Sequence, residues 1–215
     1  IAQYLQLVLG MGPLEAGIWT APSGIVFALG SMAAPFLVRA FRPGTVIAWG
    51  FLLSSLGFAL LTQLSAAHSP WLLFAGMMIF CLGLAPIGAI TTDLVMAEAP
   101  PERAGAASAI SETSFEFGGA LGIAVLGSIV TALYRSAMGG AVLGDMSPHS
   151  VEVARDTLGG AVSVAHQLGG DGGERLLATA REAFVYAFEV TSAVSAVGAI
   201  VAAVIAALLL KRVER

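Results

Sequence analysis

Two carboxylates, Glu112 and Glu116, lie four residues apart in a stretch of the sequence that is otherwise poor in charge. On a helix, residues at this spacing share one face. Beyond Glu116, only small and apolar residues follow as far as Tyr134. A charge deep in a bilayer costs several kcal/mol, and such residues usually face a bundle interior, a water-filled cavity or a partner. The pair is therefore predicted to bind a cation or a proton.

The chemistry expected of this pair is exchange of a proton for a cation. Burial and a neighbouring carboxylate both favour the protonated form, so we expect one of the two to hold a proton near neutral pH. A lipophilic cation that arrives would favour the ionised form and expel that proton. The rings of Phe115 and Phe117, adjacent in sequence, would add cation–π attraction wherever they face the cavity.

Two further acids, Asp93 and Glu189, fall inside predicted membrane spans, whereas no Lys or Arg does. Asp93 is near the end of its span, where we favour a structural bond to the following loop, residues 100–105, over a role in transport. Glu189 is near the opposite surface and belongs either to an outer vestibule or to the solvated end of its helix. Glu112 is two turns from its helix end, so snorkelling or contact with the helix N-terminus is the alternative to a cavity role.

The composition is that of a membrane protein. Of the 215 residues, 57% are hydrophobic and 11% are charged, whereas a soluble domain carries about a quarter charged residues. A net charge of −4 with scattered Lys and Arg argues against nucleic-acid binding. The single Cys81 allows no internal disulfide and no multi-thiolate metal site. His68, His149 and His166 are expected to be solvated, and no nucleotide-binding glycine motif is present, so no cofactor is expected.

Five stretches are long and apolar enough to cross a bilayer, which takes about 20 residues each. They are residues 17–38, 45–67, 71–97, 105–134 and 183–210. An apolar run over 1–11 is too short to span and is interpreted as the end of a truncated helix, followed by a turn over 12–17. The sequence thus predicts an all-α membrane bundle of five transmembrane helices and one truncated helix, part of a longer protein.

The segment over residues 135–182 differs from the spans. Ser147 followed by Pro148 is typical of a helix start, and apolar residues then recur at helical spacing as far as Ala165. After a turn over 168–173, a second helix is expected to start near 171–174 and to continue into the last span. A helical hairpin is favoured over a flexible linker. The predicted division is a bundle over 1–134, the hairpin over 135–182, and the last helix with its tail over 183–215.

The basic residues predict the orientation. Short turns at 39–44, 98–104 and 211–215 fall on one side of the predicted bundle and carry Lys and Arg. By the positive-inside rule, this side and the C-terminus are cytoplasmic. We therefore expect a multi-pass protein of the cytoplasmic (inner) membrane, with the hairpin outside.

Four segments carry a resemblance to a known family: residues 3–6, 13–17, 100–108 and 117–128. They resemble the C-terminal half of drug:proton antiporters of the major facilitator superfamily. The similarity is greatest to the fourteen-helix branch that exports quaternary ammonium compounds and other lipophilic cations. The resemblance implies alternating access around a site shared with an N-terminal half. It also implies lipophilic cationic molecules, protons and the lipid bilayer as partners, with the proton as coupling ion.

The resemblance also assigns roles to single residues. In the resembling exporters, acids of the penultimate helix recognise cationic drugs and couple protons, and the matching positions here are Glu112 and Glu116. Some relatives have another acid in the helix that matches residues 17–38, where this sequence has none.

A second element of the resemblance is a conformational latch. The turn that contains Arg39, Arg42 and Gly44 resembles the basic loop that such transporters use as a latch, but it lacks the usual acid. The small residues Gly118, Gly119 and Gly122 are predicted to permit close helix packing, with helix rocking as a secondary possibility.

Two other functions stay open. The same fold also exports other small molecules, such as antibiotics, siderophores or metabolites. A membrane subunit of a proton-translocating enzyme is disfavoured because no Lys lies within the spans, and an intramembrane hydrolase because the spans hold no Ser/His pair. We therefore expect a transporter rather than an enzyme.

Overall fold

The computed structural model describes residues 1–64, 69–139 and 146–210, and within these ranges it contains helices and no strand. Five helices are long and apolar enough to span a membrane, as the sequence predicts. They are α1 (Pro13–Ala40), α2 (Pro43–Leu60, continued by the 3-10 turn η2, Leu61–Gln63), α4 (Pro70–Glu98), α5 (Ala104–Gly139) and α8 (Gly170–Leu209). The protein is an all-α membrane bundle.

Proline sets the start of three of these helices. Pro13, Pro43 and Pro70 each begin a helix after an extended residue. The fixed φ of proline suits the first helical position, where its missing N–H removes no hydrogen bond. Because α1 begins at Pro13, the predicted turn over 12–17 is wrong: residues 13–17 are already helical.

The chain before α1 forms one short π-helical turn, η1 (Tyr4–Val8). It is fixed to the far end of the sequence, because Arg181 Nε donates a hydrogen bond to the carbonyl oxygen of Leu7 at 2.9 Å. Gly10 follows with φ of 73°, a conformation that residues with a side chain rarely adopt. The run over 1–11 is thus a helical turn that folds back toward α8.

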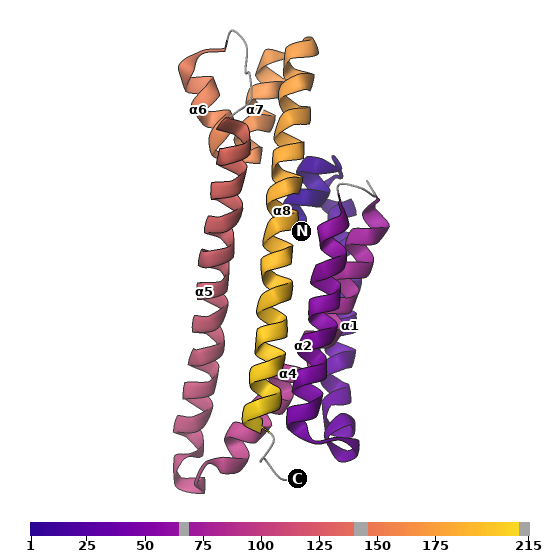
Figure 1. Ribbon diagram of the computed structural model, residues 1–215, viewed down its shortest axis with the longest axis vertical. Coiled ribbons are helices and arrows are strands. Elements are labelled where there is room, and N and C mark those ends of the chain that lie inside the picture. The colour runs from indigo at the N-terminus through magenta and orange to yellow at the C-terminus, as the bar shows by residue number, and fades with distance from the viewer. Residues whose placement is uncertain (65–68, 140–145, 211–215) are drawn as a thin grey trace.

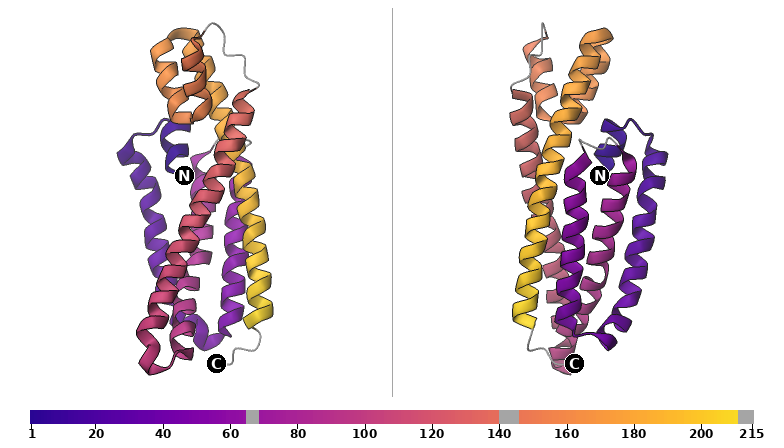
Figure 2. Two further views of the ribbon diagram at one scale, coloured as in Figure 1. Left: turned by 90° about the vertical axis from the view of Figure 1, so that its left-hand side faces the viewer. Right: turned by 45° about the vertical axis from the view of Figure 1, so that its right-hand side comes forward.

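The helices are arranged around α2 (Figures 1 and 2), which packs against α4 and α8. Helix α1 covers α4 on the other side. Helix α5 packs along α8 and touches α4 over a shorter stretch. Of the 36 residues of α5, only Tyr134 and Met138 are buried. Most of the surface of α5 is therefore open in the described part of the chain.

Glycine brings α2 and α4 close together. A Cβ atom on Gly57 would lie 2.5 Å from the Phe80 nitrogen and 2.7 Å from the Gly76 oxygen. One α-helical face repeats about every seven residues, so Gly50 shares a face with Gly57 two turns away. Gly50 and Gly83 are also in close contact. This seven-residue spacing of glycines is visible in the sequence and is the signal that could have predicted the close contact of α2 and α4.

Two short helices lie between α5 and α8, in the segment where the sequence predicts a helical hairpin. The Ser147 hydroxyl accepts a hydrogen bond from the Ser150 N–H at 3.1 Å and caps α6 (Pro148–Asp156), as predicted. Thr157 is extended and caps a separate helix, α7 (Leu158–Leu168), by accepting from the Gly160 N–H at 3.0 Å. The expectation of one continuous first helix is wrong.

The ends of the neighbouring helices also differ from the prediction. Helix α5 continues to Gly139 rather than ending at Tyr134. The turn after α7 is limited to Gly169 and Gly170, both with positive φ, rather than the whole of 168–173. Helix α8 begins at Gly170 and runs unbroken through the last span. The external helices therefore rest directly on extensions of two spanning helices (Figure 2).

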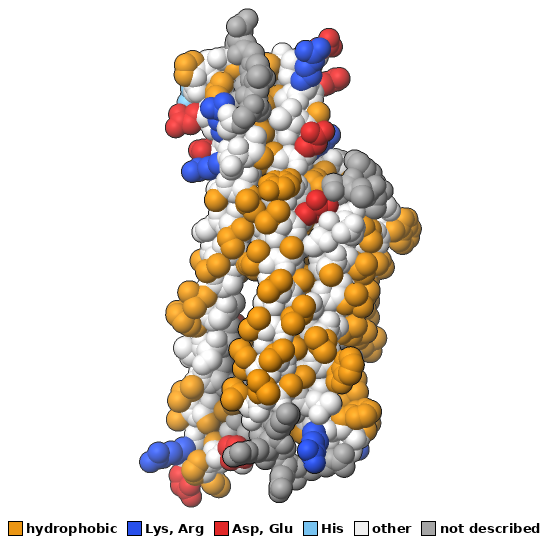
Figure 3. Space-filling view, in the orientation of Figure 1, with side chains coloured by type: hydrophobic (Ala, Val, Ile, Leu, Met, Phe, Trp, Pro, Cys, Tyr) orange, Lys and Arg blue, Asp and Glu red, His pale blue; other side chains and the backbone are white. Residues whose placement is uncertain are grey.

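Charge is segregated along the long axis. In the space-filling view, Lys, Arg, Asp and Glu gather at the two ends, and the broad band between them is almost entirely apolar or uncharged (Figure 3). The α1–α2 turn, the α4–α5 turn and the end of α8 lie at the same end, opposite α6 and α7 (Figure 1). This is the pattern of a multi-pass membrane protein. Residues 211–215 of the predicted tail, and His68, lie outside the described residues.

Candidate functional site

Glu112 and Glu116 both lie on α5 and both side chains are exposed. Neither carboxylate forms a hydrogen bond or ion pair with any residue that the structure describes. The hydroxyl groups of the same helix behave differently: Thr113 and Ser114 donate to the carbonyl oxygens of Ala109 and Ile110, both at 2.7 Å. The two hydroxyls beside the pair are therefore satisfied within the helix, whereas the two carboxylates are left open.

The two carboxylates lie at different depths. With a rise of about 1.5 Å per residue, Glu112 is about 12 Å and Glu116 about 18 Å along α5 from its first residue, Ala104. Contact of an ionised carboxylate with lipid at such depth costs several kcal/mol. The shared face of Glu112 and Glu116 is thus suited to water, a cation or another protein segment rather than to lipid, and Glu116 is the deeper position.

Phe115 is placed at the edge of this face by α4. A Cβ atom added to Gly88 of α4 would lie 3.4 Å from Cζ of Phe115, so the ring rests where Gly88 has no side chain. Phe115 remains 54% exposed, and Phe117, which points about 200° away around the helix, is 64% exposed. Phe115 is therefore the ring that borders both α4 and the carboxylates.

The other two acids are separate from the pair. Asp93 is exposed near the end of α4, and it forms no hydrogen bond to residues 100–105 within the described chain, so the expected structural bond is absent there. Glu189 is half-buried on α8, near enough to the Tyr4 hydroxyl to interact electrostatically with it. The Tyr4 ring packs on Phe188, with centroids 5.9 Å apart. Glu189 therefore belongs to the contact between η1 and α8, and its part in an outer vestibule stays a prediction.

The basic turn between α1 and α2 packs against the end of α8. A Cβ atom on Gly44 would lie 2.5 Å from Cβ of Leu210, so only glycine allows this approach. Arg42 is the N-terminal capping residue of α2, and its carbonyl accepts hydrogen bonds from the next turn. The Arg39 guanidinium carbon lies 5.8 Å from the centroid of the Phe36 ring. The turn thus connects three helices, and its role as a conformational latch stays a prediction.

The remaining predicted features are the small residues of α5, the histidines and the lack of a metal site. Around Gly118, Gly119 and Gly122 no atom lies within 4 Å of an added Cβ, so their packing role also stays a prediction. His149 and His166 are exposed, in agreement with the sequence analysis. Among the described residues, no group of three or more His, Cys, Asp or Glu is arranged to hold a metal ion.

Five spanning helices, and a mostly apolar band between the charged ends in which one helix carries an open pair of carboxylates, are features of a multi-pass membrane transporter. No family model matches the chain. It is 32% identical over 212 residues to the multidrug efflux pump LfrA of Mycolicibacterium smegmatis, covering 99% of this chain and 42% of the pump.

Two further relatives agree with this match. Identity is 30% over 208 residues to the tetracenomycin C resistance and export protein of Streptomyces glaucescens, or 93% of this chain and 39% of that protein. Identity to the methyl viologen resistance protein SmvA of Salmonella typhimurium is 29% over 190 residues, which covers 88% of this chain and 38% of SmvA. The chain belongs to the major facilitator superfamily and corresponds to the C-terminal half of these efflux and resistance proteins. It spans about two fifths of the length of these relatives.

Proposed function

We propose that this chain is the C-terminal part of a secondary transporter that exports lipophilic or cationic drugs across the cytoplasmic membrane in exchange for protons. The observation that carries the proposal is the open pair Glu112 and Glu116 on a membrane-spanning helix, which has no hydrogen-bond or ion-pair partner among the described residues. Support also comes from relatives that are named for multidrug efflux and for resistance to methyl viologen, which is an organic dication.

Glu116 is the principal binding group in this proposal. Its carboxylate attracts the cation when ionised and holds a proton when the cation has left, so cation and proton compete for the same charge. Glu112 lies one turn nearer the end of α5. It adds a second negative charge for a cation large enough to contact both carboxylates. Phe115 supplies an aromatic face beside them.

The remaining wall of the site comes from outside this chain. The face of α5 that carries the pair is not covered by described residues, and two halves that rock about a central site are the usual design of such transporters. In the proposed orientation the basic turns and the C-terminus are cytoplasmic, and α6 and α7 lie on the outer side.

The test uses the full-length transporter in everted membrane vesicles. Uptake of a fluorescent lipophilic cation is driven by a proton gradient and compared between wild type, Glu116→Gln and Glu112→Gln. Loss of the charge at the binding site is expected to lower uptake by Glu116→Gln roughly tenfold or more at equal protein level, a difference of about 1.4 kcal/mol. Glu152→Gln, at an exposed position on α6, is the matched control and is expected to transport normally.

Each outcome decides a different part of the proposal. Wild-type vesicles that accumulate no cation would reject the substrate class. Uptake that does not need the gradient would reject proton exchange. Normal uptake by both glutamine variants would remove the carboxylate pair from the site.

A second candidate function is export of an antibiotic or other small molecule that is not a cation. It is favoured by the 30% identity to a tetracenomycin C export protein. The same vesicles distinguish the two: an uncharged substrate would still be taken up by Glu116→Gln, whereas a cationic substrate would not.

A further inference from the structure

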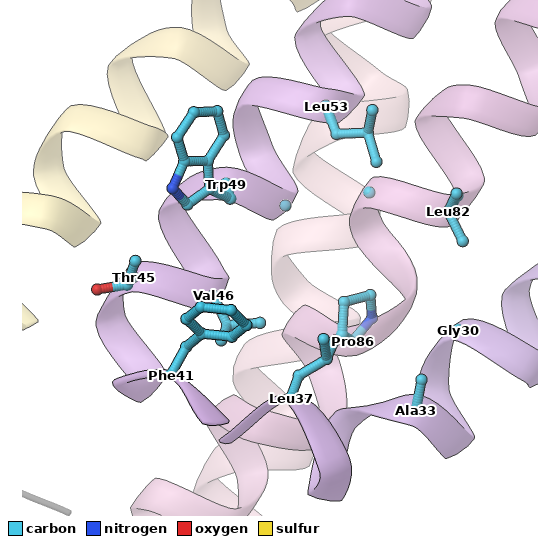
Figure 4. A pocket seen from close by; sticks show the side chains of 12 residues that line it. Gly30, Ala33, Leu37, Phe41, Thr45, Val46, Trp49, Leu53, Leu82 and Pro86 are labelled. Carbon is cyan, nitrogen blue, oxygen red and sulfur yellow. The ribbon is translucent and has the colours of Figure 1, made fainter. Parts of the chain in front are cut away.

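A groove of about 610 Å³ runs between α1 and α2, with α4 as its floor. Its apolar lining includes Leu37, Phe41, Trp49, Leu53, Leu82 and Pro86 (Figure 4). On the two sides of the groove, α1 and α2 each approach α4 closely through small residues: Gly30 faces Ala85, and Gly50 faces Gly83. It lies away from α5 and therefore does not belong to the carboxylate site.

The length of the groove matches one leaflet of a bilayer. Phe41 lies at one end and Leu53 and Leu82 at the other (Figure 4). Along α2, eight residues separate Thr45 from Leu53, which is about 12 Å at about 1.5 Å per residue, and Phe41 in the preceding turn extends the lining toward the surface. Half of a hydrocarbon core about 30 Å thick is about 15 Å. A groove that starts at the membrane surface and ends near the midplane fits one extended acyl chain.

The groove reaches the surface at a positively charged turn. Arg42 precedes Thr45 and Val46 by three and four residues, and both of these line the groove. Because Arg42 is the N-cap residue of α2, it lies at the end of the helix nearest the turn, next to this part of the groove lining. Arg42 is exposed, and it forms no ion pair with a described residue.

Arg39 lies in the same turn but on another side of α1. It follows Leu37, which lines the groove, by two residues, about 200° around the helix. Its guanidinium group lies near the Phe36 ring, which does not line the groove. Of the two arginines, which carry equal charge in the same turn, Arg42 is therefore the one next to the groove lining, because Phe41 precedes it directly and Thr45 follows it by three residues.

We propose that the groove between α1 and α2 binds an acyl chain of an anionic phospholipid whose phosphate is held by Arg42. The apolar lining takes the acyl chain, and the Arg42 guanidinium, which has no ion-pair partner among the described residues, selects a negatively charged headgroup. This proposal does not depend on proton exchange or on the transported substrate, because it concerns a different face of the molecule.

Trp49, which is 68% exposed and lines the groove, provides the readout. The full-length protein is reconstituted in phosphatidylcholine membranes that contain a minor fraction of dibrominated phosphatidylglycerol or dibrominated phosphatidylcholine. Bromine quenches tryptophan on contact, and the Trp49 component is the difference between the wild type and Trp49→Phe. With one arginine at the headgroup, half-quenching is expected at a roughly fivefold lower fraction of the anionic lipid.

Matched variants separate a built site from general surface charge. Arg42→Gln is expected to abolish the preference for the anionic lipid, Arg42→Lys to keep it, and Arg39→Gln to keep most of it. Ala33→Phe fills the groove and is expected to weaken quenching of Trp49 by both lipids. Arg175→Gln, at an exposed position near the other end of α8, is the remote control.

Several results would overturn the proposal. Equal quenching by the two lipids removes the headgroup selectivity. Equal effects of Arg42→Gln and Arg39→Gln reduce it to unspecific attraction by the basic turn. Quenching that a lipophilic drug relieves, with no preference between lipids, assigns the groove to the drug instead.

Discussion

The Tyr134 hydroxyl donates a hydrogen bond to the carbonyl oxygen of Ala154 at 2.9 Å, and both residues are buried. This bond joins the C-terminal end of α5 to the last turn of α6. Beside it, Arg135 and Asp156 form an ion pair at 2.9 Å whose side chains are about half exposed. One junction therefore contains a buried neutral bond and a solvated charged pair, which differ in the stability they are expected to contribute.

Replacing Tyr134 by Phe is expected to destabilise the protein. The Ala154 carbonyl would stay buried without a partner, which costs about 1–3 kcal/mol. The measurement is the thermal unfolding midpoint of the purified full-length protein. Tyr186→Phe is the control, because that side chain is 53% exposed. If Tyr134→Phe melted at the wild-type temperature, the bond would not hold α6 on α5.

Replacing Asp156 by Asn is expected to change stability by less than about 1 kcal/mol. Its side chain is 52% exposed and that of Arg135 57%, and exposed ion pairs gain little over their hydration and are screened by salt. The thermal unfolding midpoints of the wild type and Asp156→Asn, each at low and at high salt, measure this change in stability. A larger loss than that of Tyr134→Phe would show that charge, rather than the buried bond, fixes the junction.

Replacing Gly57 by Ala is expected to cost about 1–3 kcal/mol, the usual range for forcing extra atoms into a packed contact. The obstacles are the Phe80 nitrogen and the Gly76 oxygen, which are backbone atoms, so no side-chain rotation relieves the clash. The unfolding midpoint is again the measurement. Gly105→Ala is the matched control, because no atom lies within 4 Å of its added Cβ among the described residues. Equal midpoints for the two variants would mean that α2 and α4 separate easily.

Replacing Phe115 by Leu is expected to raise the KM for a lipophilic cation by up to roughly fivefold, the size of one cation–π contact. Leu keeps an apolar side chain beside Gly88 of α4 and removes the aromatic face. Phe117→Leu, on the opposite side of α5, should leave the KM unchanged. Concentration-dependent uptake in everted vesicles measures both. A shared effect would show that general helix packing, rather than an aromatic contact, is being measured.

The spanning helices follow from the sequence because apolar length is a local property. Residues 71–97 were expected to span, and the helix is Pro70–Glu98. The shared face of Glu112 and Glu116 likewise follows from a spacing of four residues on a helix. Such features need no knowledge of which helices are neighbours.

The break at Thr157 was missed because it depends on a contact between two helices. Gly160 packs directly on the carbonyl oxygen of Val153, and no larger residue fits there. The apolar spacing continues across the break, so the periodicity alone indicated one helix. A Thr followed three residues later by Gly, with the hydroxyl free to cap, was the available signal.

The candidate site was predictable only in part for a similar reason. Phe115 and Phe117 both adjoin Glu116 in the sequence, and Phe115 is also three residues from Glu112, a helical neighbour. The contact of Phe115 with Gly88 of α4 depends on tertiary packing and does not follow from this spacing. The groove between α1 and α2 was not predicted at all, because its lining residues come from three helices and one turn.

The length of helix α8 has a further consequence for how movement at one membrane surface reaches the other. The helix runs for 40 residues without a proline or a break, about 60 Å at about 1.5 Å per residue. One end contacts α7, and the residue after its other end contacts Gly44 in the basic turn. A stiff rod held at both ends transmits a tilt rather than absorbing it. A protein that binds α6 and α7 and holds them in place would thus restrict movement of the basic turn at the opposite membrane surface, without entering the transport pathway.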